Sequence, residues 1–183
     1  MELSGENMKL KYFFLAIMLL TAVMACKQNE QETRIGLTPA IGERMQMAPF
    51  KKSSLTDKAI IDSRQYDGQV LLVTFFATWC PPCIQEIPAF IALQNSYKSK
   101  GFSVVAFSVD EGDLPLLEKL IDKNGINYPV FLADSEVARS FGGVTGIPVT
   151  FLVNREGEIV KKFLGYTSHE ILEEDIKTVL TAG

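Results

Sequence analysis

The stretch Trp79-Cys80-Pro81-Pro82-Cys83 places two cysteines at a change of hydrophobic pattern. Before it, residues 70–76 form an uncharged run rich in β-branched and aromatic side chains, which predicts a buried strand. After it, apolar residues recur at helical spacing, which predicts a helix over residues 81–99. The cysteine pair is therefore expected at the junction between a strand and a helix.

A cysteine pair at the start of a helix is suited to reversible disulfide chemistry. The first N–H groups and the helix dipole stabilise a thiolate, so the pKa of Cys80 is expected below its free value of about 8.5. The Cys80 thiolate would attack a substrate disulfide, and Cys83 would then attack the Cys80 sulfur and release the reduced substrate. Pro81 and Pro82 fit the first helical positions, where a missing N–H costs little, and they stiffen the loop.

Two other interpretations of the cysteine pair are weaker. Half of a zinc site would need two further Cys or His ligands, and the sequence offers Cys26 and His169 alone. A permanent structural disulfide is compatible with an exported protein. A loop this short at the start of a helix nevertheless favours a redox-active pair.

Length and composition indicate one ordinary domain with additional segments. The chain has 183 residues, and 47% of them are hydrophobic, which is enough for a substantial core. The net charge of −4 and the scattered lysines argue against a nucleic-acid surface. With three cysteines and one histidine, a disulfide-stapled mini-protein, a His-based metal site and Cys–His catalysis are not expected.

Residues 1–25 have the organisation of a secretory signal. Lys9 and Lys11 precede an apolar run of about 14 residues, shorter than the roughly 20 that a spanning helix needs. Met8 begins this pattern more cleanly than Met1 does. We therefore expect translation to start at Met8.

The signal ends in Val23-Met24-Ala25-Cys26, which resembles a bacterial lipobox. This resemblance implies cleavage before Cys26 and diacylglycerol on the Cys26 sulfur, which would hold the protein on a membrane surface. An ordinary signal peptide followed by a chance cysteine is the alternative. Residues 26–44 are polar and without periodicity, so we expect a flexible tether between the lipid and the domain.

The folded domain is expected over residues 45–183. Weak signals before residue 66 suggest an N-terminal β-hairpin, and residues 102–109 form a second buried strand, which predicts a right-handed βαβ unit. Beyond this unit, we expect a helix at 114–124, a strand at 128–132 and a short helix through 141, capped by Asp134 or Ser135. Strands at 147–153 and 158–164 follow. A last helix runs through 180 and begins with a capping box at Thr167-Ser168-His169-Glu170. The predicted class is α/β, with one central mixed sheet flanked by helices.

The run Phe75-Phe76-Ala77-Thr78-Trp79-Cys80-Pro81-Pro82-Cys83, with Ile147-Pro148-Val149-Thr150-Phe151 and a hairpin downstream, resembles the thioredoxin superfamily. It is more closely similar to the exported, membrane-tethered thiol-disulfide oxidoreductases of the TlpA/ResA/CcmG type. The resemblance covers about residues 45–183. It implies a thioredoxin-like fold with an extra αβ insertion at residues 110–142.

The same resemblance implies roles for individual residues. Cys80 matches the nucleophile and Cys83 the resolving cysteine, so the two are expected to form the redox disulfide. Trp79 matches the aromatic flank of the active site. Pro148, after Ile147, matches a cis-proline that lies against the disulfide and whose backbone binds the substrate chain. The cis form of a peptide bond costs little free energy only when it precedes proline. The alternative is a trans proline at the start of a strand.

Two positions bear on proton handling. Plain thioredoxins carry a buried Asp six residues before the first cysteine, and here that position is Thr74, which cannot act as a base. Glu86 matches a glutamate that TlpA/ResA-like proteins place near the active site, where it could move protons or raise thiol pKa values. The alternative is an acid that merely favours the helix dipole in the first turn. Asp110 and Glu111 follow a strand and could line the rim of the active site, but solvated loop acids are the favoured interpretation.

The resemblance implies a tethered reductase of disulfides in exported proteins, often apocytochrome c. It would be recharged by a membrane electron donor of the DsbD/CcdA type, in the periplasm or cell envelope of a bacterium. It would act as a monomer without a cofactor besides its cysteine pair. A disulfide oxidant is the same fold at a different potential, which the sequence does not fix.

Two further functions are weighed against this one. A peroxiredoxin-like thiol peroxidase of the AhpC/TSA type places Thr three residues before the reactive cysteine, within Pro-x-x-x-Thr-x-x-Cys. Here Thr78 lies two residues before Cys80, and the upstream proline is missing. A copper chaperone of the SCO type needs a CxxxC spacing and a distant histidine, and the spacing here differs.

Overall fold

The computed structural model describes residues 45–112 and 114–182. The predicted signal, the start at Met8, the lipidation of Cys26 and the tether therefore lie outside the described residues. Within the described part of the chain, no helix combines the length and the apolar character needed to cross a membrane.

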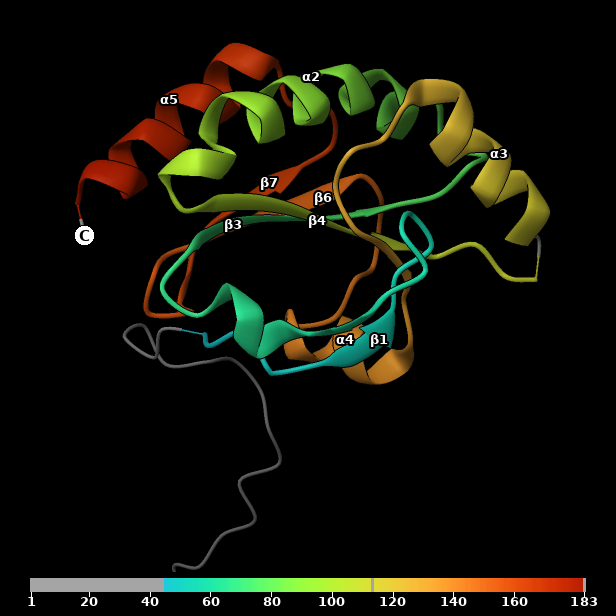
Figure 1. The fold of residues 1–183 in the computed structure, drawn as a ribbon, viewed down its shortest axis with the longest axis horizontal. Coiled ribbons are helices and arrows are strands. Elements are labelled where there is room, and N and C mark those ends of the chain that lie inside the picture. Colours follow the sequence, from blue (N-terminus) through green and yellow to red (C-terminus); the bar gives the residue numbers. More distant parts are fainter. Residues whose placement is uncertain (1–44, 113, 183) are drawn as a thin grey trace, which may run out of the picture. The chain divides into compact units, whose positions relative to one another are not determined.

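Within the described residues, a five-stranded mixed sheet forms the centre of the domain (Figure 1). The middle strand β3 (Val70–Phe76) is parallel to β4 (Phe102–Ser108) and antiparallel to β6 (Val149–Val153). Strand β5 (Val130–Leu132) pairs with β4 at one edge, and β7 (Ile159–Leu164) pairs with β6 at the other. Because β3 is central, the segment that follows it leaves from the middle of the sheet.

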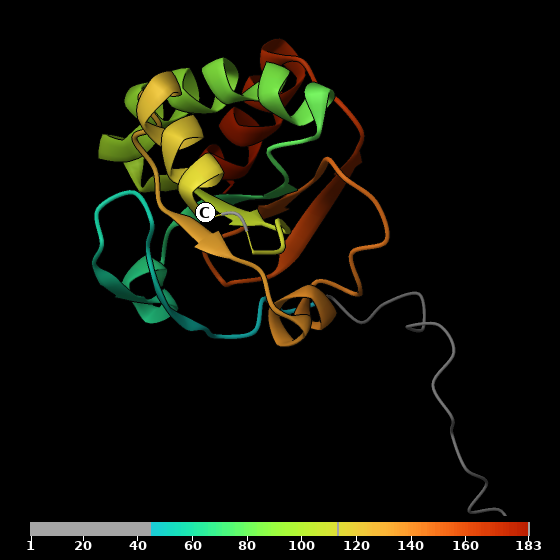
Figure 2. The same ribbon diagram turned by 90° about the vertical axis from the view of Figure 1, so that its right-hand side faces the viewer.

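The two faces of the sheet are covered by different elements (Figures 1 and 2). Three helices cover one face: α2 (Pro81–Tyr97), α3 (Leu114–Asn124) and α5 (His169–Thr181). The opposite face carries the hairpin of β1 (Lys51–Ser53) and β2 (Ile60–Asp62), the turn η1 (Ser63–Tyr66) and α4 (Ser135–Ser140). The mixed sheet, the hairpin and the αβ elements within 110–142 confirm the expected fold class.

Alternation along β3 divides the core between the two faces. Val70 and Leu72 belong to the cluster that also holds both cysteines and α2, whereas Leu71, Val73 and Phe75 face the hairpin and α4. Buried aromatic rings on the second face lie with centroids 5.0–6.5 Å apart, which adds to the energy of area burial. The face of the sheet that carries Val70 and Leu72 therefore packs against both cysteines and α2.

Helix boundaries agree with the sequence to within about one residue except at two ends. The helix expected to reach residue 99 is α-helical to Tyr97 and continues as the turn η2 (Lys98–Lys100), which ends at Gly101 with φ of 77°. The capping box expected at residues 167–170 is wrong. Helix α5 begins at His169 with Ser168 as its N-cap, and the Ser168 side chain makes no capping hydrogen bond. In a capping box at residues 167–170, the N–H of Thr167 would donate to the Glu170 side chain. Here that N–H donates to the Glu86 carboxylate instead.

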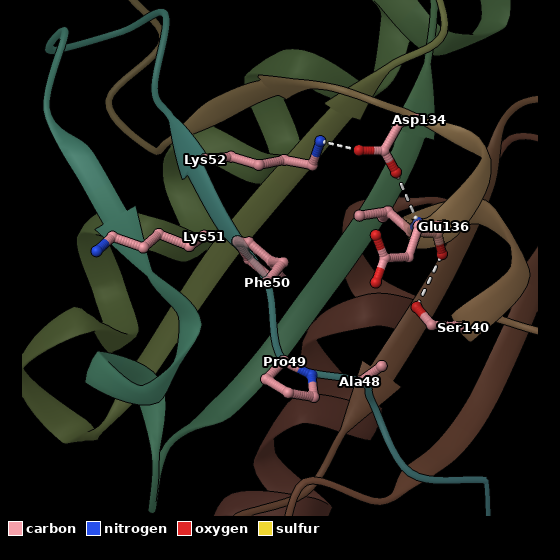
Figure 3. Close-up of a pocket in the computed structure, with 9 residues that line it drawn as sticks. Ala48, Pro49, Phe50, Lys51, Lys52, Asp134, Glu136 and Ser140 are labelled. Atoms are coloured by element: carbon pink, nitrogen blue, oxygen red, sulfur yellow. Dashed lines mark hydrogen bonds and ion pairs between the residues drawn. The ribbon is translucent and has the colours of Figure 1, made fainter.

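Helix α4 has the N-cap that the sequence predicted, and the cap also fastens the hairpin (Figure 3). The Asp134 carboxylate accepts from Val137 N at 2.8 Å and forms an ion pair with Lys52 of β1. These groups line a pocket of about 150 Å³ between the hairpin and α4. The pocket lies on the face of the sheet opposite α2, so it is separate from the cysteine pair.

Candidate active site

Cys80 and Cys83 are joined by a disulfide at the N-terminus of α2. Cys80 is the N-cap residue with extended backbone, and Pro81 and Pro82 occupy the first two helical positions. Cys80 is 5% exposed and Cys83 is 1% exposed, so in the disulfide form Cys80 is the more accessible of two buried cysteines. This order agrees with Cys80 as the attacking residue and Cys83 as the resolving residue.

The two prolines change what the start of the helix can donate. A helix N-terminus normally presents several free N–H groups to a nearby anion. Pro81 and Pro82 have no N–H, and Ile84 N already donates to Cys80 O at 3.2 Å. Within the first turn, the N–H of Cys83 is thus the backbone donor left for a thiolate on Cys80.

Trp79 directly precedes Cys80 in the chain. Its side chain is 67% exposed, more than any Phe or Tyr side chain among the described residues. It borders a hollow of about 400 Å³ together with Val109, Glu111 and Leu116. Trp79 lies in the segment after β3, Val109 and Glu111 lie in the segment after β4, and Leu116 belongs to α3 of the insertion. The insertion therefore supplies one wall of the surface next to the cysteines.

The Ile147–Pro148 peptide bond is cis, as the resemblance implied. Val149, the next residue, pairs with Phe75 near the end of β3, so Pro148 lies at the same end of the sheet as the cysteine segment. The Pro148 carbonyl accepts from Gly165 N at 2.9 Å, and Ile147 packs partly buried between the two core clusters. The expected active-site elements are thus brought to one end of the sheet.

Thr74 occupies the middle of β3 without a charged partner. It is 2% exposed, and its Oγ1 accepts from the Thr150 hydroxyl at 3.0 Å across the β3–β6 pair. This one hydrogen bond gives each of the two buried hydroxyls a partner. The position that holds an acid in plain thioredoxins is therefore neutral here.

Glu86 is buried on α2, one turn after Cys83, with 1% of its area exposed. Burial raises its pKa to about 7, although the hydrogen bond from Thr167 N to Oε1, at 2.8 Å, acts in the opposite direction. Its other oxygen, Oε2, has no hydrogen-bond partner among the described residues. A surface acid placed for the helix dipole would be solvated, so the structure opposes that alternative.

Asp110 is not the solvated loop acid that the sequence suggested. Its carboxylate accepts from Thr78 N, at 3.2 Å to Oδ1 and 3.0 Å to Oδ2, and from the Thr78 hydroxyl at 2.7 Å. The Thr78 hydroxyl is therefore engaged away from Cys80, unlike the threonine of the peroxidase pattern. Parallel strands end at the same edge, so an acid directly after β4 could have been expected near the segment after β3. Glu111, by contrast, is exposed.

Residues 42–180 match the Redoxin family model, which is more than half of the chain. The matched range includes the disulfide, Glu86, Asp110 and Pro148.

Individual relatives agree with this match. The thiol-disulfide oxidoreductase ResA of Bacillus thuringiensis (strain Al Hakam) is 30% identical over 141 residues, 75% of this chain and 80% of the relative. ResA of Halalkalibacterium halodurans is 29% identical over 119 residues, 65% of this chain and 67% of that protein. Among solved structures, a thiol:disulfide interchange protein of the thioredoxin family from Chlorobium tepidum TLS is 33% identical, with a TM-score of 0.71 over 77% of this chain and 99% of that chain.

Proposed function

This chain belongs to the redoxin family, as a TlpA/ResA-like thiol-disulfide oxidoreductase of the thioredoxin superfamily, and we propose that it reduces disulfides of exported proteins from a membrane tether. Cys80 supplies the attacking thiolate, and Cys83 resolves the mixed disulfide. The overall reaction transfers two electrons from the dithiol to the substrate disulfide. The substrate leaves with two thiols, and the protein returns to the state with Cys80 and Cys83 joined.

The observation that supports reduction rather than oxidation is the pair of prolines at the start of α2. A dithiol protein is a strong oxidant when its reduced form is stabilised. Pro81 and Pro82 remove two N–H donors that would stabilise a thiolate on Cys80, and a negative charge on Glu86 would destabilise it further. Both effects favour the disulfide in the protein and therefore the transfer of electrons to a substrate.

The reduction potential tests this direction. Trp79 is the sole tryptophan of the chain, so its fluorescence reports on the neighbouring cysteine pair during titration with glutathione or dithiothreitol. We expect a potential nearer to thioredoxin, at about −270 mV, than to DsbA, at about −120 mV. A potential above about −180 mV would assign the protein to the oxidants instead.

Glu86 is proposed as the group that handles the proton during exchange. Residues three positions apart on a helix are neighbours, so Glu86 lies next to Cys83 on the buried side of α2. A carboxyl with a pKa of about 7 can give and take a proton at neutral pH. In this role, ionised Glu86 would take the proton from the Cys83 thiol as Cys83 attacks the Cys80 sulfur, and the protonated carboxyl would then release that proton to solvent.

Location and partners are further parts of the proposal. The lipobox-like Val23-Met24-Ala25-Cys26 supports a lipid anchor, so Cys26→Ser should move the protein from the membrane fraction to the soluble exported fraction. An unchanged membrane fraction would refute the anchor at Cys26. We expect a monomer, recharged by a membrane donor of the DsbD/CcdA type.

A trapping experiment identifies the substrate, with apocytochrome c as one candidate. Cys83→Ala leaves Cys80 able to form the mixed disulfide but removes the residue that would release it. The matched control carries both Cys80→Ala and Cys83→Ala. Exported cysteine proteins bound by the single variant and absent from the control would support the proposal, and identical captures from both variants would contradict it.

A further inference from the structure

The Asp110 carboxylate accepts hydrogen bonds from the end of β4 and from the segment that follows β3. Besides both donors of Thr78, it accepts from the Ser108 hydroxyl at 2.6 Å on Oδ2. The Asp110 N–H in turn donates to Ser108 Oγ at 3.1 Å, and Ser108 is fully buried at the end of β4. Asp110 is thus fixed to β4 on one side and holds Thr78 on the other.

The segment that Asp110 holds is short and leads directly to the reactive cysteine. β3 ends at Phe76, whose carbonyl accepts from Val109 N at 2.9 Å, and α2 begins after Cys80. Three residues, 77–79, connect these two fixed points. Cys80 N donates to Ala77 O at 3.2 Å, so the segment forms a tight turn with Thr78 at its middle. The backbone of this turn sets the direction of the Cys80 side chain.

We propose that Asp110 is a positioning residue for disulfide exchange, which holds Thr78 so that Trp79 and Cys80 are presented to the substrate. This inference rests on the proposed function, since it concerns the attack by Cys80. In that step the Cys80 thiolate forms a bond to one substrate sulfur while the substrate disulfide breaks, and the leaving sulfur takes a proton from solvent. Asp110 acts through Thr78 and needs no contact with the reacting atoms.

The site requires a carboxylate of this length. An ionised carboxylate accepts at both oxygens and donates nothing, which matches the three donors that point at Asp110. An amide at this position would turn an NH₂ group toward one of these donors. A glutamate is one methylene longer and would have to move Thr78 or abandon Ser108. Asp110→Asn and Asp110→Glu are therefore both expected to impair the presentation of Cys80.

The experiment measures insulin reduction with dithiothreitol as the electron source, and separately the reaction of the reduced protein with oxidised glutathione. For Asp110→Ala we expect roughly a tenfold loss of kcat, with KM within about twofold of the parent, and a similar loss of rate with glutathione. Thr78→Val keeps the N–H bond, so its loss should be smaller. Thr78→Ser keeps both bonds and should retain activity within about twofold.

Coupling between the two residues separates positioning from general destabilisation. If Asp110 acts through Thr78, the double variant Asp110→Ala, Thr78→Val should be no slower than Asp110→Ala alone. The fluorescence anisotropy of Trp79 should fall in Asp110→Ala while the folded fraction, from circular dichroism, is unchanged. The matched control is Glu174→Gln, which removes an exposed charge on α5 outside the lining of the hollow at Trp79 and should leave both readouts unaltered.

Two results would overturn the inference. One is an Asp110→Ala protein whose rates remain within about twofold of the parent. The other is a loss that follows the unfolded fraction, with multiplicative effects in the double variant and unchanged Trp79 anisotropy. If the parent itself failed to reduce insulin, the proposed function would fail, and the rates with oxidised glutathione would still decide the role of Asp110.

Discussion

Replacing Glu86 with glutamine should remove a pH dependence of stability that the structure assigns to this one side chain. Glu86 is 1% exposed, and burial raises its pKa from 4.5 to about 7 in the folded protein. The folded state therefore binds the proton more tightly than the unfolded state does. Stability from this group is fully present below pH 4.5 and is lost as the pH rises to about 7.

The size of the effect follows from the two pKa values. At about 1.4 kcal/mol for each pH unit, the change from 4.5 to about 7 corresponds to about 3 kcal/mol of unfolding free energy. Glutamine does not titrate, so Glu86→Gln lacks this loss. The Thr167 N–H keeps an acceptor in the variant, but an amide NH₂ at the place of Oε2 finds no partner, which costs about 1–3 kcal/mol at every pH. The slope with pH, rather than the offset, is the informative quantity.

Urea unfolding of the oxidised protein between pH 4.5 and 8 provides the measurement. In the oxidised form Cys80 and Cys83 do not titrate, so ionisation of these two thiols does not contribute. The pKa of nearby Tyr128 is raised above its usual range by burial and by the charge of Glu86, so Tyr128 remains neutral throughout. All other titrating groups are shared and cancel in the difference between the two proteins.

The expected result is a difference that grows in favour of Glu86→Gln by about 3 kcal/mol across this range. The control Glu174→Gln, at an exposed position of α5, should differ from the parent by a nearly constant amount. Parallel curves for Glu86→Gln and the parent would show that Glu86 is ionised at pH 5, and the reasoning from burial would be wrong. The same variant should also lose the inflection near pH 7 in the rate of thiol exchange, and an unchanged profile would refute a proton-handling role.

Three other substitutions test the helix start, the sheet and the cap. Pro82→Ala restores an N–H in the first turn, and one charged hydrogen bond should raise the thiolate fraction of reduced Cys80 about tenfold; equal alkylation rates by iodoacetamide at pH 7 would contradict this. Thr74→Val leaves the Thr150 hydroxyl without its acceptor and should lower the free energy of urea unfolding by about 1–3 kcal/mol. The double variant Thr74→Val, Thr150→Val should lose less, and a loss equal to the sum of the two single losses would argue against a hydrogen bond between these side chains. Asp134→Ala removes the α4 cap and should cost about 1 kcal/mol, whereas an unchanged midpoint would show that the ion pair and cap contribute nothing.

The sequence predicted the fold well where periodicity is strong. Strand β3 is recognisable because its seven uncharged residues are apolar except for Thr74. The helix is recognisable because helical spacing begins at a cysteine pair that encloses two prolines. The positions of Cys80, Cys83 and Pro148 at one end of the sheet followed from motifs whose spacing is specific. These features depend on neighbours in the chain, which a sequence displays directly.

Contacts between distant segments were less accessible. A capping box at Thr167 was predicted from local spacing, but the Thr167 N–H donates to Glu86, which lies 81 positions earlier in the chain. Asp110 is expected from the sequence to be a solvated acid after a strand, whereas its carboxylate binds Thr78, which lies 32 positions earlier in the chain. Both misses have the same physical origin, because tertiary contacts override local preference once strands bring distant backbone donors together.

The replacement of a buried acid by Thr74 changes where a proton can be held in this protein. An acid on the central strand would be enclosed by the sheet, whereas Thr74 and Thr150 close that position with a neutral hydrogen bond. The buried carboxyl in this protein is that of Glu86 on α2. Its Oε1 accepts from Thr167 N, and its Oε2 has no hydrogen-bond partner among the described residues and can carry a proton. The segment that binds Glu86 also binds Pro148, through Gly165 N and the Pro148 carbonyl. A carboxyl held in this way is desolvated enough to titrate near neutral pH and is fixed relative to both Cys83 and the cis-proline, as the proposed proton transfer would need.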